Sequence, residues 1–348
     1  MNKETLHIYV NLPGKTPCFS TIQEALDSVA CESAPVAYPA PHEDIAPVVI
    51  HIGKGTYREN LVITRPYLTL VGEGDAREDV VIVYGLYANE IMPEGDKRGT
   101  FRTASVRIFT HDFTAKHITF QNDAGFGYQV GQALALYVDG DRACFEDCSL
   151  LGSQDTLFTA PLPEKEFQPG GFKGPGEFLP RTMTRQFYKN CYIQGDVDFI
   201  YGSAICWFED CVIFSKYPDG RELPEDPNHK SILGYVTAAS TPESGEFGYV
   251  FNNCKLESDC PAQTIMLGRP WREFAKTVFL NCELGEHIHP VGWMDWGKTH
   301  GNFYYGEYNS YGPGASPETR ADFSHQMTAE EAAKYTMENV LKDWNPLA

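Results

Sequence analysis

The chain has 348 residues, of which 42% are hydrophobic, and it carries a formal net charge of −19. This charge excludes nucleic acid and anionic membranes as expected partners, because both would repel the protein. The sequence contains no run of about 18 apolar residues and starts without the apolar core of a signal peptide, so we expect no membrane span. The location stays open: the protein would be cytoplasmic if Met1 is the native start, and secreted if a leader was removed.

The first predicted element in chain order is a helix within TIQEALDSV (21–29). Its apolar residues Ile22, Ala25, Leu26 and Val29 share one face of a helix. We expect this helix to cap the first coil and to protect its edge.

The middle of the chain repeats one short pattern: an aromatic residue, any residue, Asp or Asn, Cys, any residue and an aliphatic residue. Five of the ten cysteines lie in its copies, which are FEDCSL (145–150), YKNCYI (188–193), FEDCVI (208–213), FNNCKL (251–256) and FLNCEL (279–284), with FTAKHI (113–118) as a degenerate sixth. A repeated short strand with loops of varying length is typical of a solenoid. We therefore predict an all-β parallel β-helix that forms one domain over residues 1–348, with a bend at each Asp or Asn.

The cysteines of neighbouring copies are expected to lie close enough together to form a disulfide bond. Stacked coils lie about 4.8 Å apart, close to the Cα separation that a disulfide needs. Cys191 and Cys211 are the candidate pair if the compartment is oxidising, and two reduced buried thiols are the alternative.

Three inserts and a C-terminal helix complete the predicted elements. The inserts 32–47, 161–180 and 216–230 are rich in Pro, Gly and charged residues, so we expect surface loops that wall a cleft. In TAEEAAKYTMENVL (328–341), Thr328 and Glu331 form a capping-box pattern, which predicts a helix packed along the outside.

Two carboxylates interrupt apolar runs: Asp155 in LGSQDTLF (151–158) and Asp198 in GDVDFIYG (195–202). They are 43 residues apart, and roughly twenty of these belong to the insert 161–180. We therefore expect them on neighbouring coils, about 5 Å apart. Two carboxylates this close cannot both ionise easily, so one pKa should be raised, which provides an acid and a carboxylate for catalysis.

Two reaction classes fit such a pair. A retaining glycosidase uses a similar separation, and an esterase could use the pair if donors stood ready for an oxyanion. Gln154 and Gln132 are donors of that kind and favour acyl chemistry. In LGRPW (267–271), Arg269 could hold a carboxylate ionised, and Trp271 offers a flat face to a sugar ring.

Other catalytic classes have less support in the sequence. A serine hydrolase is disfavoured because no Gly-x-Ser-x-Gly segment occurs. The spacing of His287 and His289 would suit a metal, but Pro290 follows, so we interpret this segment as a loop with solvated imidazoles and predict no metal.

With these segments in view, the chain resembles the pectin methylesterases, or pectinesterases, of the bacterial type. The resemblance rests on GSQDTLF, GDVDFIYG and LGRPW, preceded by GQALALYVDGDRACFEDC (131–148). It extends to TIQEALDSV, IHIGKGTYREN (50–60) and EYNSYGPGA (307–315), so it covers nearly the whole chain.

The resemblance implies a right-handed parallel β-helix that hydrolyses the C6 methyl ester of galacturonate units in pectin. Asp198 would be the nucleophile, and Asp155 would act first as general acid and then as general base. Gln154 and Gln132 would stabilise the oxyanion, and Arg269 would hold Asp198 ionised.

The substrate implied is methyl-esterified homogalacturonan or its oligomers, acted on by a monomer without cofactor. The residues expected to line the sugar subsites are Trp271, Tyr201, Phe158, Trp293 and Met294.

Three residues depart from the family pattern. An aromatic residue is common where this chain has Ser153, a Phe is common where it has Tyr201, and a small or hydroxyl residue is usual where it has Asp196. If Asp196 faces the cleft it would disfavour demethylated product, and if it faces solvent it would have no effect.

Rival functions remain within the same fold. A polygalacturonase-like hydrolase would carry closely spaced acidic pairs and a Gly-His-Gly segment, and a pectate lyase would need a calcium cluster; neither is evident. A β-helix esterase or thioesterase on another acyl group would also fit the fold, as would a sugar-binding solenoid without catalysis.

Overall fold

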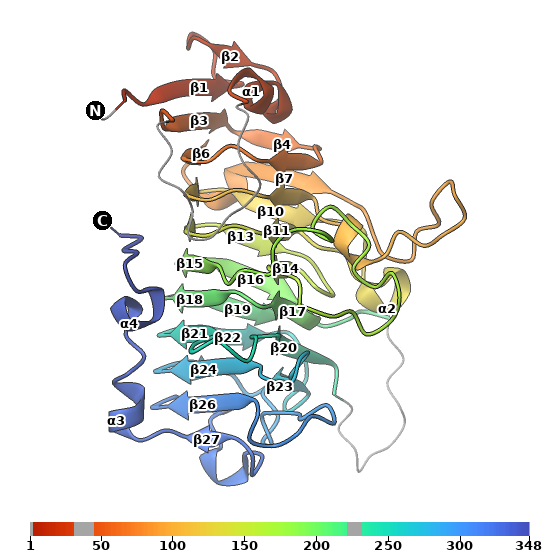
Figure 1. The fold of residues 1–348 in the computed structure, drawn as a ribbon, viewed down its shortest axis with the longest axis vertical. Helices are drawn as coiled ribbons and strands as arrows, with labels where there is room; N and C mark the ends of the chain where they lie inside the picture. Colours follow the sequence, from red (N-terminus) through yellow and green to blue (C-terminus); the bar gives the residue numbers. More distant parts are fainter. Residues whose placement is uncertain (1–2, 31–44, 221–231, 348) are drawn as a thin grey trace.

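The computed structural model describes residues 3–30, 45–220 and 232–347. Its strands stack from the N-terminal to the C-terminal end of an elongated molecule (Figure 1). Every pairing between the named strands is parallel, and successive strands enter three sheets in turn, so the chain winds as a parallel β-helix as predicted.

The three sheets contain twelve, eight and seven strands. In spatial order, the 12-stranded sheet consists of β2 (Cys18–Phe19), β1 (Leu6–Val10), β3 (Val48–Gly53), β6 (Leu68–Glu73), β9 (Phe113–Lys116), β12 (Ala143–Glu146), β15 (Arg185–Lys189), β18 (Ile205–Glu209), β21 (Tyr249–Asn252), β24 (Lys276–Leu280), β26 (Tyr304–Tyr308) and β27 (His325–Gln326). The 8-stranded sheet consists of β25 (Glu283–Leu284), β22 (Lys255–Ser258), β19 (Val212–Ser215), β16 (Tyr192–Gly195), β13 (Ser149–Leu151), β10 (Thr119–Asn122), β7 (Val80–Tyr84) and β4 (Gly55–Tyr57). The 7-stranded sheet consists of β23 (Ile265–Gly268), β20 (Gly234–Ala239), β17 (Val197–Gly202), β14 (Leu157–Thr159), β11 (Leu136–Val138), β8 (Val106–Ile108) and β5 (Leu61–Ile63).

Short helices connect and cap these sheets. They are α1 (Ile22–Ser28), η1 (Arg77–Asp79), η2 (Thr100–Arg102), α2 (Gly127–Val130), η3 (Pro317–Thr319), α3 (Ala329–Ala332) and α4 (Met337–Leu341). No helix in the described part of the chain is long and apolar enough to cross a bilayer.

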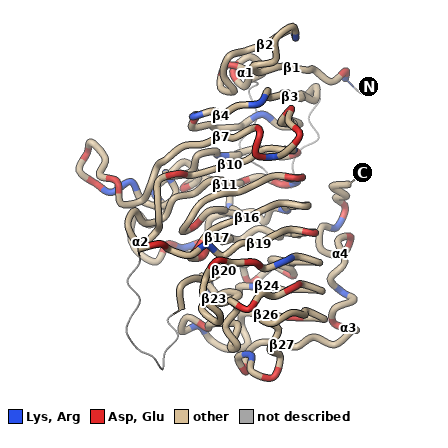
Figure 2. The backbone as a smooth tube through the Cα atoms, turned by 180° about the vertical axis from the view of Figure 1, so that it is seen from behind, with Lys and Arg blue, Asp and Glu red and all other residues tan. Residues whose placement is uncertain are grey.

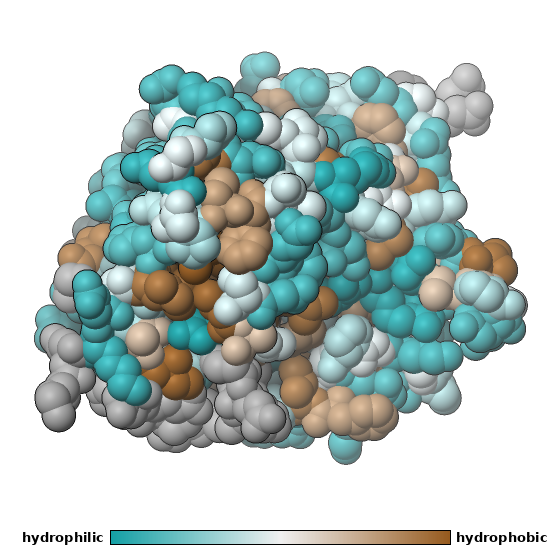
Figure 3. Space-filling model, turned by 90° about the horizontal axis from the view of Figure 1, so that it is seen from above, coloured by the Kyte–Doolittle hydropathy of each residue, from teal (hydrophilic) through white to brown (hydrophobic). Residues whose placement is uncertain are grey.

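The helix at the N-terminal end confirms the prediction for residues 21–29. Thr21 caps α1, with Glu24 completing the capping box, and Ile22, Ala25 and Leu26 are buried. The helix contacts β1 and β2 at the end of the stack (Figure 1). Viewed from above, this end presents a mainly hydrophilic surface with smaller apolar patches (Figure 3), as expected if the first coil is covered.

The expectation of one continuous helix over 328–341 was wrong. The capping box of Thr328 and Glu331 is present, but α3 ends at Ala332 and α4 starts at Met337. Thr336 interrupts the helix because its backbone is extended and its side chain accepts from Asn339 N, which caps a second helix instead. The outside location is confirmed, since α4 packs against β18 and Val340 and Leu341 are buried there.

Each copy of the cysteine repeat crosses from one sheet to the next, so it covers the ends of two strands rather than one. In FEDCSL, β12 ends at Glu146 and β13 begins at Ser149. The bend falls at the Asp or Asn, as predicted, and the backbone there is left-handed, with φ of 50°, 51°, 55°, 53° and 55° at Asp147, Asn190, Asp210, Asn253 and Asn281. Asp and Asn tolerate this conformation better than other residues with a Cβ atom, which explains why the repeat keeps them there.

Aromatic residues of the repeat stack inside the helix. The ring centroids of Phe145, Tyr188, Phe208, Phe251 and Phe279 follow one another at 4.9, 4.8, 4.3 and 4.5 Å. The rings are nearly parallel and fully buried, so each coil packs on the next through this ladder.

We expect Phe208→Ala to lower the free energy of unfolding by about 3–5 kcal/mol, because it opens a cavity in the middle of this ladder. The matched control is Phe178→Ala, since Phe178 is 90% exposed and its truncation should change stability by at most about 0.5 kcal/mol. Chemical denaturation of both variants measures the difference. Equal stability of the two variants would contradict a stabilising role for the stacked rings.

The repeat cysteines form a second stack beside the aromatic ladder. Cys191 and Cys211 are buried and free, and the Cys191 N–H donates to Cys211 Sγ at 3.4 Å. All nine cysteines in the described ranges are free, so of the two possibilities for this pair the structure has the reduced one.

Charged residues of both signs are spread along the stack from end to end (Figure 2). This distribution agrees with an acidic surface exposed to solvent rather than one concentrated site. Most of the inserts 32–47 and 216–230 lies outside the described residues, whereas 161–180 is described and contributes to the cleft below.

Candidate active site

The two carboxylates lie side by side on adjacent coils, as their spacing predicted. Leu157 of β14 pairs with Ile200 of β17, which places Asp155 and Asp198 at equivalent positions of neighbouring coils. The Asp155 N–H donates to Val197 O at 3.1 Å and holds the two segments together.

The backbone at both carboxylates is unusual. Asp155 has φ of 64° and Asp198 has φ of 50°, in the left-handed region that costs a residue with a Cβ atom of order 1–3 kcal/mol. The register of β17 against β20 also shifts between Val197 and Ile200. A bulge of this kind redirects a side chain, which explains how Asp198 occurs within a strand without entering the core.

Arg269, which follows β23, binds Asp198 with two parallel hydrogen bonds. Its Nε donates to Oδ1 at 2.8 Å and its Nη2 to Oδ2 at 2.6 Å. The guanidinium lies 3.9 Å from the ring centroids of both Tyr235 and Trp296, which fix its plane from two sides. This geometry fixes the orientation of the Asp198 carboxylate.

The surroundings of the two carboxyl groups shift their pKa values for different reasons. Burial, together with the nearby charge of Asp198, raises the pKa of Asp155 well above its usual value, while the Tyr201 hydroxyl opposes the shift. Burial also raises the pKa of Asp198, but there the hydrogen bonds from Arg269 oppose the change. Burial and the charge of Asp198 thus favour the protonated form of Asp155, whereas the hydrogen bonds from Arg269 favour the ionised form of Asp198.

A cavity of about 290 Å³ opens above the two carboxylates. The residues that line it include all five predicted catalytic ones, namely Gln132, Gln154, Asp155, Asp198 and Arg269. Around them stand the aromatic residues Phe101, Phe167, Phe172, Tyr201, Trp271 and Trp296. The site thus combines a carboxylate pair, two amide side chains and an apolar rim suited to a sugar ring.

A family model described as Pectinesterase matches residues 10–164 and 172–344. The chain belongs to the pectinesterase family. It is 34% identical to Pectinesterase A of Dickeya dadantii (strain 3937) over 96% of this chain and 89% of the relative. Against some plant pectinesterase/pectinesterase inhibitor relatives, the chain spans only 50% of their length.

Solved structures of pectinesterases have the same fold. Pectin methylesterase PemA from Erwinia chrysanthemi is 30% identical, with a TM-score of 0.76 and 99% of each chain covered. A crystal structure of pectin methylesterase in complex with a hexasaccharide matches with the same identity, TM-score and coverage.

The sugar-contact residues expected from the pectinesterase resemblance divide into two groups. Tyr201 and Trp271 line the cavity. Phe158 does not, because it is completely buried and packs behind the wall, 4.8 Å from the Tyr201 ring and 5.0 Å from the Phe101 ring.

The expectation for Trp293 was wrong, whereas that for Met294, which is partly exposed, stays a prediction. Trp293 is 1% exposed, stacks on Tyr305 at 4.2 Å and donates its indole N–H to Glu307, so it belongs to the core. Met294 lies outside the cavity lining, and its sulfur accepts from the Tyr235 hydroxyl at 3.2 Å. A bridge between Gly268 and Trp293 turns this segment inward, and it is Trp296 that reaches the cavity.

Several lining residues had not been anticipated. Trp296 lies three residues beyond Trp293 in the same segment, but sequence alone gives no basis for choosing between the two. Phe167 and Phe172 belong to the insert 161–180, which confirms that this insert walls the cleft.

Two of the three departures from the pectinesterase pattern, Ser153 and Asp196, lie behind the site, whereas the third, Tyr201, lines the cavity. Ser153 accepts a hydrogen bond from Lys216 at 3.2 Å. Asp196 is 2% exposed and accepts from the Val197 N–H at 2.6 Å. It therefore faces neither cleft nor solvent, so neither of the two alternatives considered for it applies.

His287 also differs from expectation. Its side chain is 3% exposed, and burial lowers the pKa of its imidazole to about 4, so it is neutral rather than solvated. Within the ranges that the structure describes, no three His, Cys, Asp or Glu side chains form a group that could hold a metal ion.

Proposed function

We propose that this protein hydrolyses the methyl esters of galacturonate units in pectin, releasing methanol and leaving carboxylates. The observation that carries the proposal is the Asp155, Asp198 and Arg269 arrangement in a member of the pectinesterase family. The hexasaccharide bound to a relative of the same fold supports a substrate of linked sugar units.

Asp198 acts as the nucleophile. Its carboxylate attacks the ester carbonyl, and the C6 carbonyl oxygen becomes the oxyanion of a tetrahedral intermediate. This intermediate collapses to an acyl-enzyme anhydride as the bond to the methoxy group breaks and methanol leaves. The two hydrogen bonds from Arg269 support this role because they keep Asp198 ionised and oriented.

Asp155 transfers the protons. Its raised pKa suits a general acid, which gives a proton to the methanol that leaves. The resulting carboxylate then takes a proton from the water that attacks the anhydride, and Asp198 is regenerated. Gln154 and Gln132, which line the same cavity, donate amide N–H groups to the oxyanion in both steps.

The substrate is methyl-esterified homogalacturonan or its oligomers, held against Tyr201, Trp271 and Trp296. One chain supplies all five catalytic residues, so a monomer suffices. The reaction uses only protein groups and water, and we propose no cofactor.

The test is methanol release from highly methylated pectin and from a methylated oligogalacturonide. We expect methanol from at least one substrate without any change in chain length, which chromatography of the oligomer monitors. Shorter oligomers without methanol would indicate a glycosidase, and the absence of both products from folded protein would refute the proposal.

A further inference from the structure

The Tyr201 hydroxyl is a buried polar group of the catalytic cavity to which the proposed mechanism gives no role. Tyr201 lines the cavity together with Asp155, and it is only 3% exposed. Its hydroxyl has no hydrogen-bond partner among the residues that the structure describes. An unpaired buried hydroxyl is costly, so we expect it to find a partner in another state of the site.

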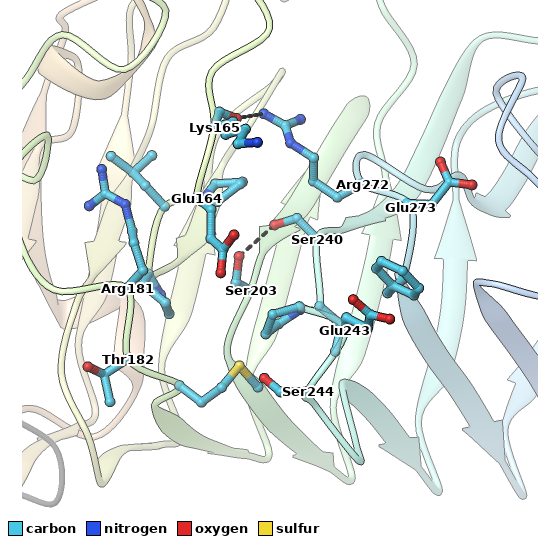
Figure 4. A pocket seen from close by; sticks show the side chains of 17 residues that line it. Glu164, Lys165, Arg181, Thr182, Ser203, Ser240, Glu243, Ser244, Arg272 and Glu273 are labelled. Atoms are coloured by element: carbon cyan, nitrogen blue, oxygen red, sulfur yellow. Dashed lines mark hydrogen bonds between the residues drawn. The ribbon is translucent and has the colours of Figure 1, made fainter.

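The Tyr201 ring is held in one position. Tyr201 pairs with Phe158 of the preceding coil, and the centroids of the two rings lie 4.8 Å apart. The Trp271 ring packs against it edge to face, with the centroids 5.6 Å apart. The end of the strand is fixed as well, because Ser203 forms a hydrogen bond with Ser240 of the next coil at 2.7 Å (Figure 4). The hydroxyl therefore keeps its place while the reaction changes the charges around it.

Asp155 is the acceptor with which this hydroxyl interacts. Burial and the charge of Asp198 raise the pKa of Asp155, and the Tyr201 hydroxyl opposes them. Burial and, after it, Asp155 raise the pKa of Tyr201 well above its usual value, so the phenol keeps its proton and can donate a hydrogen bond. Such a donor stabilises a carboxylate more than a carboxylic acid.

The charges that act on Asp155 change during the proposed reaction. In the free enzyme, Asp198 and, less strongly, Asp196 disfavour ionised Asp155. Arg269 favours the ionised form, and the two amide side chains of the cavity are neutral. In the anhydride Asp198 carries no charge, so Asp155 can then ionise without a like charge beside it. This is the state in which the hydroxyl gains its acceptor.

We propose that Tyr201 is a positioning residue for proton transfer, whose hydroxyl donates a hydrogen bond to Asp155 once Asp155 has given its proton to the departing methanol. The inference rests on the proposed function, in which Asp155 is first an acid and then a base. The hydrogen bond orients the carboxylate that takes a proton from the attacking water. Tyr201 itself neither gains nor loses a proton, so the proposed hydrolysis stays balanced.

The test is Tyr201→Phe, which removes the hydroxyl and keeps the ring. Asp155 should then be harder to ionise. Because the free enzyme needs protonated Asp155, the alkaline limb of the kcat/KM profile should move to higher pH by about one unit, as expected for the loss of one hydrogen bond to a charged group. The acid limb, which Asp198 sets, should stay in place.

The second chemical step gives a second readout. Deacylation needs ionised Asp155, so at low pH the variant should accumulate more acyl-enzyme than the wild type. Mass spectrometry of quenched reactions measures the acylated fraction at each pH. Equal fractions in the wild type and Tyr201→Phe across the pH range would contradict the inference.

Tyr137→Phe is the matched control. Tyr137 occupies the equivalent position two coils earlier, since it pairs with Phe158, which pairs with Tyr201. Its hydroxyl is also buried without a partner in the described part of the chain, but Tyr137 lies outside the lining of the catalytic cavity. Its loss should leave both limbs of the profile at the wild-type pH.

A measurement without turnover separates this inference from the proposed function. Infrared spectroscopy of the free enzyme follows the C=O band of protonated Asp155, which is identified by its absence in Asp155→Asn. The band should persist to higher pH in Tyr201→Phe than in the wild type. Thermal unfolding checks that the variants are folded, and Tyr201→Met, which also lacks the hydroxyl, replaces Tyr201→Phe if that variant is unstable.

The possible results distinguish the two proposals. A band that titrates at the wild-type pH in the folded variant, or at a lower pH, overturns the role of the Tyr201 hydroxyl alone. A wild type that releases no methanol from pectin or from methylated oligomers refutes the proposed function instead.

Discussion

Replacing Asp198 with asparagine is expected to lower kcat for methanol release by about 10⁵-fold, because the amide cannot form the acyl-enzyme anhydride. The change is nearly isosteric, and Asp198 is only 8% exposed, so the cavity should keep its shape. Steady-state assays on methylated pectin measure the loss. Mass spectrometry of quenched reactions should detect an acyl-enzyme only in the wild type.

The control for this variant is Asp139→Asn. Asp139 follows β11, is 2% exposed and lies outside the catalytic cavity lining, and burial raises its pKa to about 7. Loss of a buried carboxyl there should leave most of the activity. Similar rates for the Asp198 and Asp139 variants would rule out Asp198 as the nucleophile.

Arg269→Met is expected to reduce kcat/KM by about 10³-fold at neutral pH, because it removes two charged hydrogen bonds from the proposed nucleophile. Burial raises the pKa of Asp198 and Arg269 lowers it, so the variant should have a higher Asp198 pKa. A larger fraction of Asp198 is then protonated at a given pH. The acid limb of the kcat/KM profile should shift to higher pH, with activity recovering as the pH rises.

Arg269→Lys separates charge from geometry. A lysine restores a cation but cannot form the two parallel hydrogen bonds, so its acid limb should lie between those of the wild type and the methionine variant. An acid limb that stays at the wild-type pH in Arg269→Met would show that Arg269 does not control the ionisation of Asp198.

The fold could be predicted from the sequence because each copy of one repeated pattern shows where the chain bends and which residue enters the core. The Asp or Asn of each copy, such as Asp147 and Asn281, marks a left-handed bend, and the aromatic residue before it marks a position in the core. The break in the C-terminal helix could not be predicted in the same way. Thr336 fits a helix interior and a helix cap equally in sequence, and packing against β18 selects the cap.

The candidate site was predictable where strand register determines it and not where loops do. Asp155 and Asp198 meet because adjacent coils are in register. By contrast, the choice between Trp293 and Trp296 depends on one bridge, at Gly268, that no local pattern reveals. The insert 161–180 supplies Phe167 from a loop outside the repeated strands, and the Phe167 ring packs on Arg272, which is distant in the sequence.

The reactivity of the stacked cysteines shows when the coils of the β-helix separate. Cys148, Cys191, Cys211, Cys254 and Cys282 are at most 1% exposed, and burial raises the pKa of Cys148 to about 12. A thiol reagent in solution therefore cannot react with them while the coils are stacked, whereas Cys18 is exposed and reacts first. The buried thiols are modified only after their coils have come apart, so the rate of their labelling by the reagent follows the unfolding of the β-helix without an engineered label.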